Sequence, residues 1–348
     1  QNKIKAFLHD PPDKALILGH RAHEERRDEI LQTLKLTYDK RLNSADHIAS
    51  AIQRIDLPEE LRKYHIYFKD PVKPVFKHTL SGETENLEEI KDFIETYGYE
   101  KAVDEYSLTS KITEKFLRGK IDINWKETYF LLWRYLPEEY PLGCFLPAET
   151  RIPDHSILDH LDVTAAISSC LGDLGLFALK IPAVQEFISH SRKLSDLWAS
   201  SYIFSQLIFE GIRVIIDEFG PDTVIYPHLR GNPLFDISIL QEKPNNLKGQ
   251  LQIANFPNTF LSLVPSKKAE EIAKKCEDKI KSKWQKIAEE VKRIIKEKLD
   301  IEINETLWRK QINNAISVST AWREVFDFDR YKDEKNELPK DLRDRQDK

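Results

Sequence analysis

The chain has 348 residues, with 53 lysines and arginines against 58 aspartates and glutamates, and a formal net charge of −5. This balance excludes a general affinity for polyanions, so any nucleic-acid surface must be local. The three cysteines form no C-x-x-C pair, which argues against a disulfide framework or zinc site and favours a cytoplasmic protein. Methionine is absent, even at the first position, which favours a fragment of a longer chain.

Residues 1 to about 170 are predicted to be mostly helical. The stretch "IKAFLHDPP" has apolar residues at helical spacing, and its two prolines must end the helix. Asp10 is therefore predicted at a helix C-terminus, where the macrodipole disfavours a negative charge by a few tenths to about 1 kcal/mol. It needs a nearby cation, either a bound metal or a lysine such as Lys14.

A second helix is predicted around "LNSADHIASAIQRID". Ser44 is a good N-cap, and Ile48, Ile52 and Ile55 form one apolar face. The proline-rich stretch 57–85 is predicted to be irregular or partly extended, and helical patterns return over 86–140.

The pattern changes near residue 172. The apolar run "LGLFALKI" (174–181) predicts a strand, and a long helical region follows over 183–219, ended by Gly220 and Pro221. Three further strands are predicted at "DTVIYP", "LFDISIL" and "FLSLVP". This order is typical of a ferredoxin-like α+β sheet. No stretch approaches the roughly 20 apolar residues of a membrane span, so no membrane association is predicted.

A highly charged helix is predicted over 266–299, with an apolar stripe that runs from Ile280 through Trp284 and Val291 to Ile295. Between Lys279 and Lys298 it carries eight basic residues against three glutamates. This face would suit a phosphate backbone, although a solvated face is the commoner explanation. The polar tail after about residue 329 is predicted to be disordered or to await a partner.

Histidines and aspartates cluster in the helical part of the chain. His9-Asp10 is followed by His20 and His23, then by Asp46-His47, and "DHSILDHLD" (154–162) contains His160. Imidazole and carboxylate together suit Mn, Fe, Ni, Zn or Mg, and two such metals can activate water against a phosphodiester. Two structural alternatives stay open. Asp46 would complement the dipole of a first helical turn, and 154–162 would serve equally as a solvated turn and helix start.

The predicted sheet lacks the acidic residues of a two-metal nucleotidyl-transfer site. Its first strand offers Ala178 and Lys180, and the hairpin "HLRGNP" has no acidic pair. If the sheet handles nucleotides, it does so as a binding half. The small residues of "DLWASSYIFS" would allow a ligand to approach closely, or would simply pack helix on sheet.

Six segments in order resemble a known family. They are "FLHDPPDKAL", "SADHIASAIQR", "PAETRIPDHSILDHLDVTAAI", "FALKIPAVQEFISHSRKLSDLWASSYIFSQLI", "VIYPHLRGNPLF" and "FPNTFLSLVP". The chain resembles, over 3 to about 265 and more loosely to about 328, the large polymerase-like subunit of type III CRISPR effector complexes of the Cmr (III-B) kind. The resemblance implies an α+β chain. A helical permuted HD-like domain (1–170) would be followed by a first ferredoxin-like palm domain (171–265) and a helical region with a polar tail (266–348).

The resemblance also implies functional residues. His9 and Asp10 match the family's His-Asp motif as catalytic and metal-binding residues. Asp46, His160 and, less closely, His23 would complete the metal site. The implied cofactors are a divalent metal (Mn, Ni or Mg) and, at the palm, ATP. Gln185 and Ser201 are predicted to line the nucleotide surface.

The implied function is the N-terminal part of the large subunit of an RNA-guided antiviral effector complex. Its HD domain would be a metal-dependent single-stranded DNA nuclease, and its first palm would partner a cyclic-oligoadenylate-forming second palm. The implied partners are other Cmr-type subunits, guide RNA and target RNA. The Gly-Gly-Asp-Asp signature of the second palm is not in this sequence, and the HD motif continues as Pro-Pro-Asp-Lys instead of Ile-Gly-Lys. A non-catalytic scaffold with a vestigial HD site, or a free-standing HD phosphohydrolase, are the alternatives.

Overall fold

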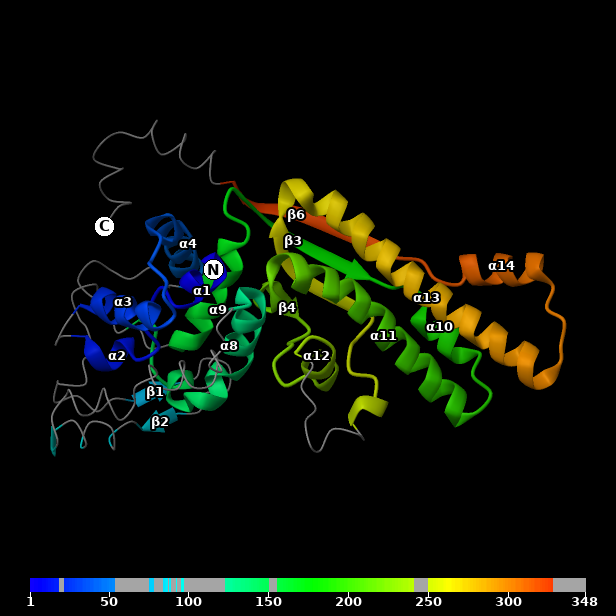
Figure 1. Ribbon diagram of the computed structural model, residues 1–348, viewed down its shortest axis with the longest axis horizontal. Coiled ribbons are helices and arrows are strands. Elements are labelled where there is room, and N and C mark those ends of the chain that lie inside the picture. The colour runs from blue at the N-terminus through cyan, green and yellow to red at the C-terminus, as the bar shows by residue number, and fades with distance from the viewer. Residues whose placement is uncertain are drawn as a thin grey trace. The chain divides into compact units, whose positions relative to one another are not determined.

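A computed structural model describes residues 1–18, 22–53, 123–149, 155–240 and 250–327, with short segments between 75 and 96. The chain forms two compact units, Gln1–Ser168 and Ser169–Lys348. The first is helix-rich and the second holds helices and a small antiparallel sheet, which confirms the α+β class at this level (Figure 1). The three domain boundaries given above stay predictions.

The first unit is built around three helices that meet through small and aliphatic side chains. α1 and α4 both contact α9, and their buried residues include Ile4, Ala45, Ala49 and Leu161. The elements of this unit are α1 (Asn2–Phe7), α2 (Lys14–Ile17), α3 (His23–Thr33), η1 (Lys40–Leu42), α4 (Asn43–Gln53), β1 (Val75–Lys77), β2 (Thr84–Asn86), α8 (Trp125–Glu139), η4 (Pro141–Cys144) and α9 (Ile157–Ser168).

The predicted face of α4 was wrong. Ala45 and Ala49 are its buried residues, whereas Ile52 is 60% exposed, and Ile55 lies outside the described residues. Ala45 and Ala49 are on the buried side of α4 because their small side chains let α4 and α9 approach each other closely. Ser44 is not the N-cap, since the chain enters α4 directly from η1 and the Asp39 side chain caps that earlier turn.

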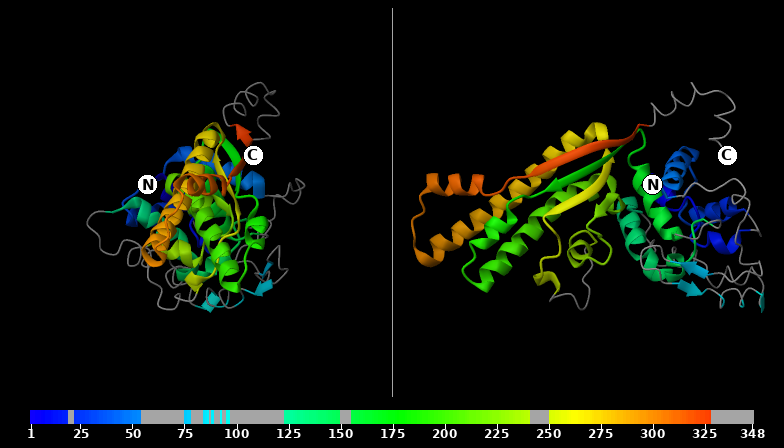
Figure 2. Two further views of the ribbon diagram at one scale, coloured as in Figure 1. Left: turned by 90° about the vertical axis from the view of Figure 1, so that its right-hand side faces the viewer. Right: turned by 180° about the vertical axis from the view of Figure 1, so that it is seen from behind.

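The second unit contains a four-stranded sheet with strand order β4-β5-β3-β6, and every pairing is antiparallel. α11 connects β3 to β4, and α13 connects β5 to β6. Both helices lie on one face of the sheet, as the left view of Figure 2 shows. The elements are β3 (Asp173–Lys180), α10 (Val184–Ser189), α11 (Leu194–Phe219), η5 (Pro221–Thr223), β4 (Val224–Tyr226), α12 (Pro233–Ser238), η6 (Gln250–Gln252), β5 (Thr259–Pro265), η7 (Ser266–Lys268), α13 (Ala269–Leu299), α14 (Glu305–Asn314) and β6 (Ser319–Asp327).

Two elements differ from the prediction. "LFDISIL" is predicted as a strand but lies in α12, because the Asn232 side chain accepts hydrogen bonds from the backbone N–H groups of Leu234 and Phe235 and Pro233 occupies the first helical turn. β6 is not predicted, since the pattern of 266–348 indicates only helix and tail. Its residues are mostly exposed on an edge strand, so they carry no apolar alternation.

The apolar stripe of α13 is buried only in its first half. Ile280 and Trp284 are buried, whereas Val291 and Ile294 are exposed at 44% and 39%. The helix therefore extends beyond the face of the sheet that it covers. The predicted tail after residue 329 lies outside the described residues.

One described helix, α11, is long and apolar enough to cross a membrane by length and composition alone, contrary to the sequence expectation. More than half of its most apolar window is buried, and it contacts α13 and β5. This burial is typical of a core helix.

α11 lies close to its neighbours at Gly211. A Cβ there would lie 3.2 Å from Ile280 Cδ1 and 3.2 Å from Phe260 Cε1. We therefore expect Gly211→Leu to destabilise the second unit by about 1–3 kcal/mol, because the core must be overpacked. Urea unfolding measures this, with Leu194→Ala at the exposed start of α11 as control, expected within about 0.5 kcal/mol of wild type. Equal stabilities for the two variants would contradict the close packing.

Candidate metal centre

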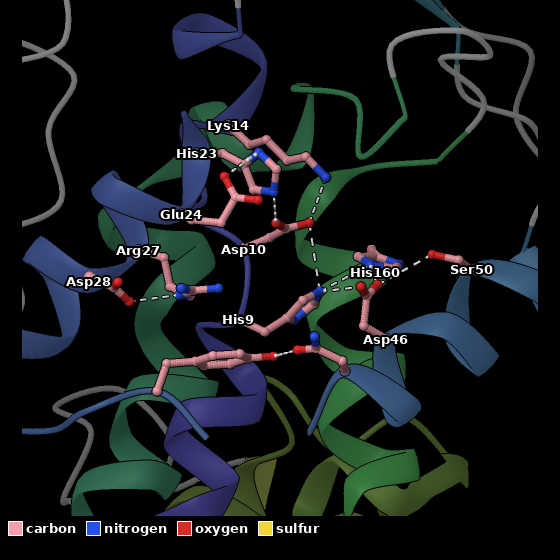
Figure 3. Close-up of polar contacts among 12 residues, drawn as sticks. His9, Asp10, Lys14, His23, Glu24, Arg27, Asp28, Asp46, Ser50 and His160 are labelled. Atoms are coloured by element: carbon pink, nitrogen blue, oxygen red, sulfur yellow. Dashed lines mark hydrogen bonds and ion pairs between the residues drawn. The ribbon is translucent and has the colours of Figure 1, made fainter. Parts of the chain in front are cut away.

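Four side chains from three segments of the first unit converge on one point (Figure 3). His9 and Asp10 follow α1, Asp46 lies on α4 and His160 on α9. His9 Nε2 lies 3.2 Å from His160 Nε2, 3.4 Å from Asp46 Oδ1 and 3.6 Å from Asp10 Oδ2. His160 Nε2 lies 3.1 Å from Asp46 Oδ1. The structure thus brings together residues that the sequence separates by up to 151 positions.

The local sequence fixes where these side chains stand. α1 ends at Phe7, so His9 and Asp10 lie in the turn beyond it and not on the helix itself. A buried Asp13–Arg26 ion pair of 3.0 Å ties that turn to α3. On the other side, the Ser156 hydroxyl accepts from the Asp159 backbone N–H and starts α9, which places His160 in its first turn.

The Nδ1 atom of each imidazole is hydrogen-bonded to an oxygen acceptor. His9 Nδ1–H donates to the Ala6 carbonyl at 2.9 Å, and His160 Nδ1–H donates to Gln53 Oε1 at 2.8 Å. In the neutral rings each Nε2 then carries a lone pair that faces the other ring and the Asp46 carboxylate. Electron-rich atoms this close repel one another unless a proton or a metal cation lies among them.

The donor set fits a divalent transition metal. The ligand atoms of His9, Asp10 and His160 lie within 4.8 Å of one another, and all three residues are buried. Imidazole nitrogen with carboxylate oxygen is the set that suits Zn, Mn, Fe or Ni. The Nδ1–H bonds to a carbonyl and an amide oxygen are the outer-shell contacts that orient metal-binding histidines. Asp46 supplies a further oxygen at the same point.

The electrostatics favour positive charge at this point. Burial lowers the pKa of His9, but the Asp10 charge and the Asp46 hydrogen bond outweigh burial and raise it above its ordinary value. The pKa of His160 is lowered, chiefly by burial. Burial alone would raise the pKa of Asp46, yet hydrogen bonds from His160 and His9 hold it well below its usual range. His9 is therefore the first of the two imidazoles to take up a proton.

We expect metal affinity to weaken as pH falls through neutral, because a proton on His9 Nε2 and a metal compete for the same lone pair. Titration calorimetry with Mn²⁺ at several pH values measures this. Affinity that is constant across neutral pH would contradict competition at His9.

Asp10 has a cation partner in the structure. Lys14 Nζ donates to Asp10 Oδ2 at 2.6 Å, and His23 Nε2 lies 3.5 Å from Asp10 Oδ1. Burial would raise the pKa of Asp10, but the Lys14 and His9 charges lower it to about 2. Of the two cations foreseen for Asp10, the lysine is the one in contact, and a metal would share the carboxylate with it.

The remaining predicted residues have different positions. His20 lies outside the described residues. Gln185 is exposed on α10 and Ser201 is half-buried on α11. The nucleotide surface therefore stays a prediction. Sequence reasoning missed Gln53, although it lies seven positions after Asp46 and so on the same face of α4.

Gln53→Ala is expected to weaken metal binding by roughly 10–100-fold, because His160 loses the acceptor that keeps its Nε2 lone pair turned inward. Calorimetry gives the affinity, and ¹⁵N chemical shifts of His160 report its tautomer. His47→Ala, an exposed site on the same helix, is the control. Unchanged affinity with an unchanged tautomer would contradict this role for Gln53.

Comparison with known proteins finds similarity to one family. Residues 176–289 match the family model of CRISPR-associated protein Cmr2, N-terminal. The CRISPR system Cmr subunit Cmr2 of Pyrococcus furiosus is 31% identical, over 81% of this chain and 37% of the relative. The corresponding subunit of Saccharolobus solfataricus is 28% identical, over 69% of this chain and 24% of the relative. The chain thus spans about a third of the first relative and a quarter of the second.

Solved structures share the fold. A chain of the type III-B Cmr-beta assembly in its apo state superposes with a TM-score of 0.70 at 22% identity, over 97% of this chain and 39% of that one. A chain of the same assembly bound to cognate target RNA gives 0.62 at 20% identity, over 99% and 39%. The chain thus shares its fold with about two fifths of each of these two chains. The chain is similar to Cmr2 subunits and over residues 176–289 to the N-terminal part of that family, which agrees with the resemblance seen in the sequence.

Proposed function

We propose that the first unit is a permuted HD domain that cleaves single-stranded DNA with a divalent metal, Mn, Ni or Mg. The observation that carries this is the convergence of His9, His160 and Asp46 on one point, with lone pairs that call for a cation. The DNA substrate follows from the family resemblance.

In this mechanism the buried residues bind the metal. The residues at the edge of the site hold or move protons and add positive charge. A bound metal supplies the positive charge that activates water and stabilises the leaving oxygen of the phosphodiester. The Nε2 atoms of His9 and His160 and the carboxylates of Asp10 and Asp46 would hold it. The Lys14 ammonium adds positive charge for the substrate phosphate. His23, with 31% of its side chain exposed, can hold or move a proton at the edge of the site.

We further propose that the second unit is a ferredoxin-like palm domain that forms the ATP-binding partner of a second palm, with Gln185 and Ser201 at the nucleotide. The β-α-β-β-α-β order and the β4-β5-β3-β6 arrangement support the palm, since two helical connections each span one intervening antiparallel strand. Other Cmr subunits, guide RNA and target RNA are the proposed partners in the assembled complex.

The test is cleavage of an end-labelled single-stranded oligonucleotide with Mn²⁺, Ni²⁺ or Mg²⁺, and with EDTA. Asp46→Asn is expected to slow cleavage by at least about 100-fold, because it removes one charged ligand of the metal. His47→Ala, the exposed neighbour of Asp46, should cut like wild type. Hydrolysis of mononucleotides without cleavage of the oligonucleotide would contradict the nuclease function and would indicate a free-standing phosphohydrolase.

A second function, a non-catalytic scaffold, is favoured by one observation. Lys14 already neutralises Asp10 at 2.6 Å, so the first unit can be stable without a metal. In that case a well-folded sample binds no metal and cuts no DNA, and the unit serves to dock other subunits.

A further inference from the structure

A basic groove of ≈300 Å³ lies between α11 and α13 in the second unit. The two helices lie side by side in Figures 1 and 2 and contact each other. The charged residues that line the groove are Arg213, Lys279, Lys283 and Lys286, with the carboxylates Glu210 and Asp217. Four cations against two carboxylates leave a local positive surplus in a chain whose net charge is −5.

The lysines form one row along α13. Residues 279, 283 and 286 are spaced four and then three positions apart, which puts them on one face of a helix. The row spans seven positions, or roughly 10 Å at 1.5 Å per residue. The core determines which way this face of α13 points, because Ile280, the residue after Lys279, packs against Gly211.

The cations of the groove are only partly neutralised by carboxylates. Outside the groove, Lys275 pairs with Glu271 at 2.8 Å, and Lys281 pairs with Glu277 at 2.6 Å. Inside it, Glu210 lies 3.6 Å from Arg213 and 3.9 Å from Lys283. Lys279 and Lys286 form no ion pair with any residue that the structure describes. Lys279 and Lys286 are therefore available to an anionic ligand, and they share one face with Lys283 and the guanidinium of Arg213.

We propose that the basic groove binds the phosphate backbone of a single nucleic-acid strand. A row of three lysines roughly 10 Å long can contact consecutive phosphates of one strand. Lysine ammonium groups act as point charges for phosphate, and Ser282 adds a hydroxyl donor. The charged groups of the lining contact phosphates and not base edges, so we expect binding that does not depend on base sequence. This site is separate from the metal centre and does not depend on it.

The test is fluorescence anisotropy of labelled oligothymidylate and oligouridylate with the full chain, in EDTA, between about 50 and 200 mM salt. Lys279→Glu/Lys286→Glu is compared with Lys281→Glu/Lys296→Glu, which makes the same change of charge on the same helix at exposed positions. The groove variant is expected to bind at least about tenfold more weakly. Its slope of log affinity against log salt should fall by about 1–2, one for each phosphate that a lysine no longer neutralises.

Three results would overturn the proposal. They are no binding by wild type, equal weakening in both variants, or tighter binding of a labelled oligoglutamate, which would assign the groove to an acidic peptide. The comparison is repeated in the His9→Ala/Asp10→Ala background. A groove effect that persists there is independent of the metal centre, and one that vanishes there assigns the binding to that centre instead.

Discussion

The His9→Ala/Asp10→Ala variant is expected to bind no divalent metal and to cleave single-stranded DNA at least about 10³-fold more slowly than wild type. The substitution removes one imidazole and one carboxylate from a buried cluster whose ligand atoms lie within 4.8 Å of one another. Metal content after dialysis and single-turnover cleavage measure the two effects. His47→Ala/Asp92→Ala, two exposed positions in the first unit, is the matched control. Cleavage that survives without bound metal would place the nuclease elsewhere.

Lys14→Met is expected to have opposite effects on stability and on metal binding. It leaves the buried Asp10 carboxylate without its partner at 2.6 Å, so the metal-free chain should lose about 3–5 kcal/mol. It also removes a cation that competes with the metal for Asp10, so Mn²⁺ affinity should rise about tenfold, or about 1.4 kcal/mol. Denaturant unfolding with and without Mn²⁺ measures both. Lys14→Arg keeps the charge and is the control.

The difference in unfolding free energy between wild type and Lys14→Met should depend on pH in both the acidic and the alkaline range. The pKa of Asp10 is lowered from 3.8 to about 2, so the pair's contribution is complete above about pH 4 and is lost as pH falls toward 2. Burial lowers the pKa of Lys14 but Asp10 raises it above 10.5, so the contribution persists to that pH and is lost only above it. A difference that stays constant from pH 4 to pH 2 would show that the ion pair is not its source.

The sequence predicted the elements whose signals are local. β3 and β5 are short apolar runs bounded by glycine and proline, and α13 has helical periodicity from end to end. α12 was misread because the capping side chain of Asn232 overrides an apolar run that is equally consistent with a strand. β6 was missed because an exposed edge strand needs no apolar alternation, and its place is fixed by pairing with β3 far away in the sequence.

In the candidate site, too, the residue types could be predicted from the sequence, whereas the interactions that orient them could not. His9, Asp10, Asp46 and His160 were identified by residue type and by resemblance, and the structure brings them together. Their geometry depends on interactions that the sequence does not display, namely those with the Ala6 carbonyl and the Gln53 amide, which set the two tautomers. The ion pair between Lys14 and Asp10 was foreseen only as one of two options, because a helix end shows the need for a cation and not its identity.

The central claim is that the His9–His160 pair holds a metal cation. Anomalous scattering from a crystal of the chain grown with Mn²⁺, recorded at the manganese edge, tests it directly. The account predicts one peak among the Nε2 atoms of His9 and His160 and the Asp46 carboxylate, at about 2.0–2.2 Å from its ligands. No peak at full Mn²⁺, with Lys14 still bound to Asp10 and the two imidazoles bridged by a proton, would contradict it.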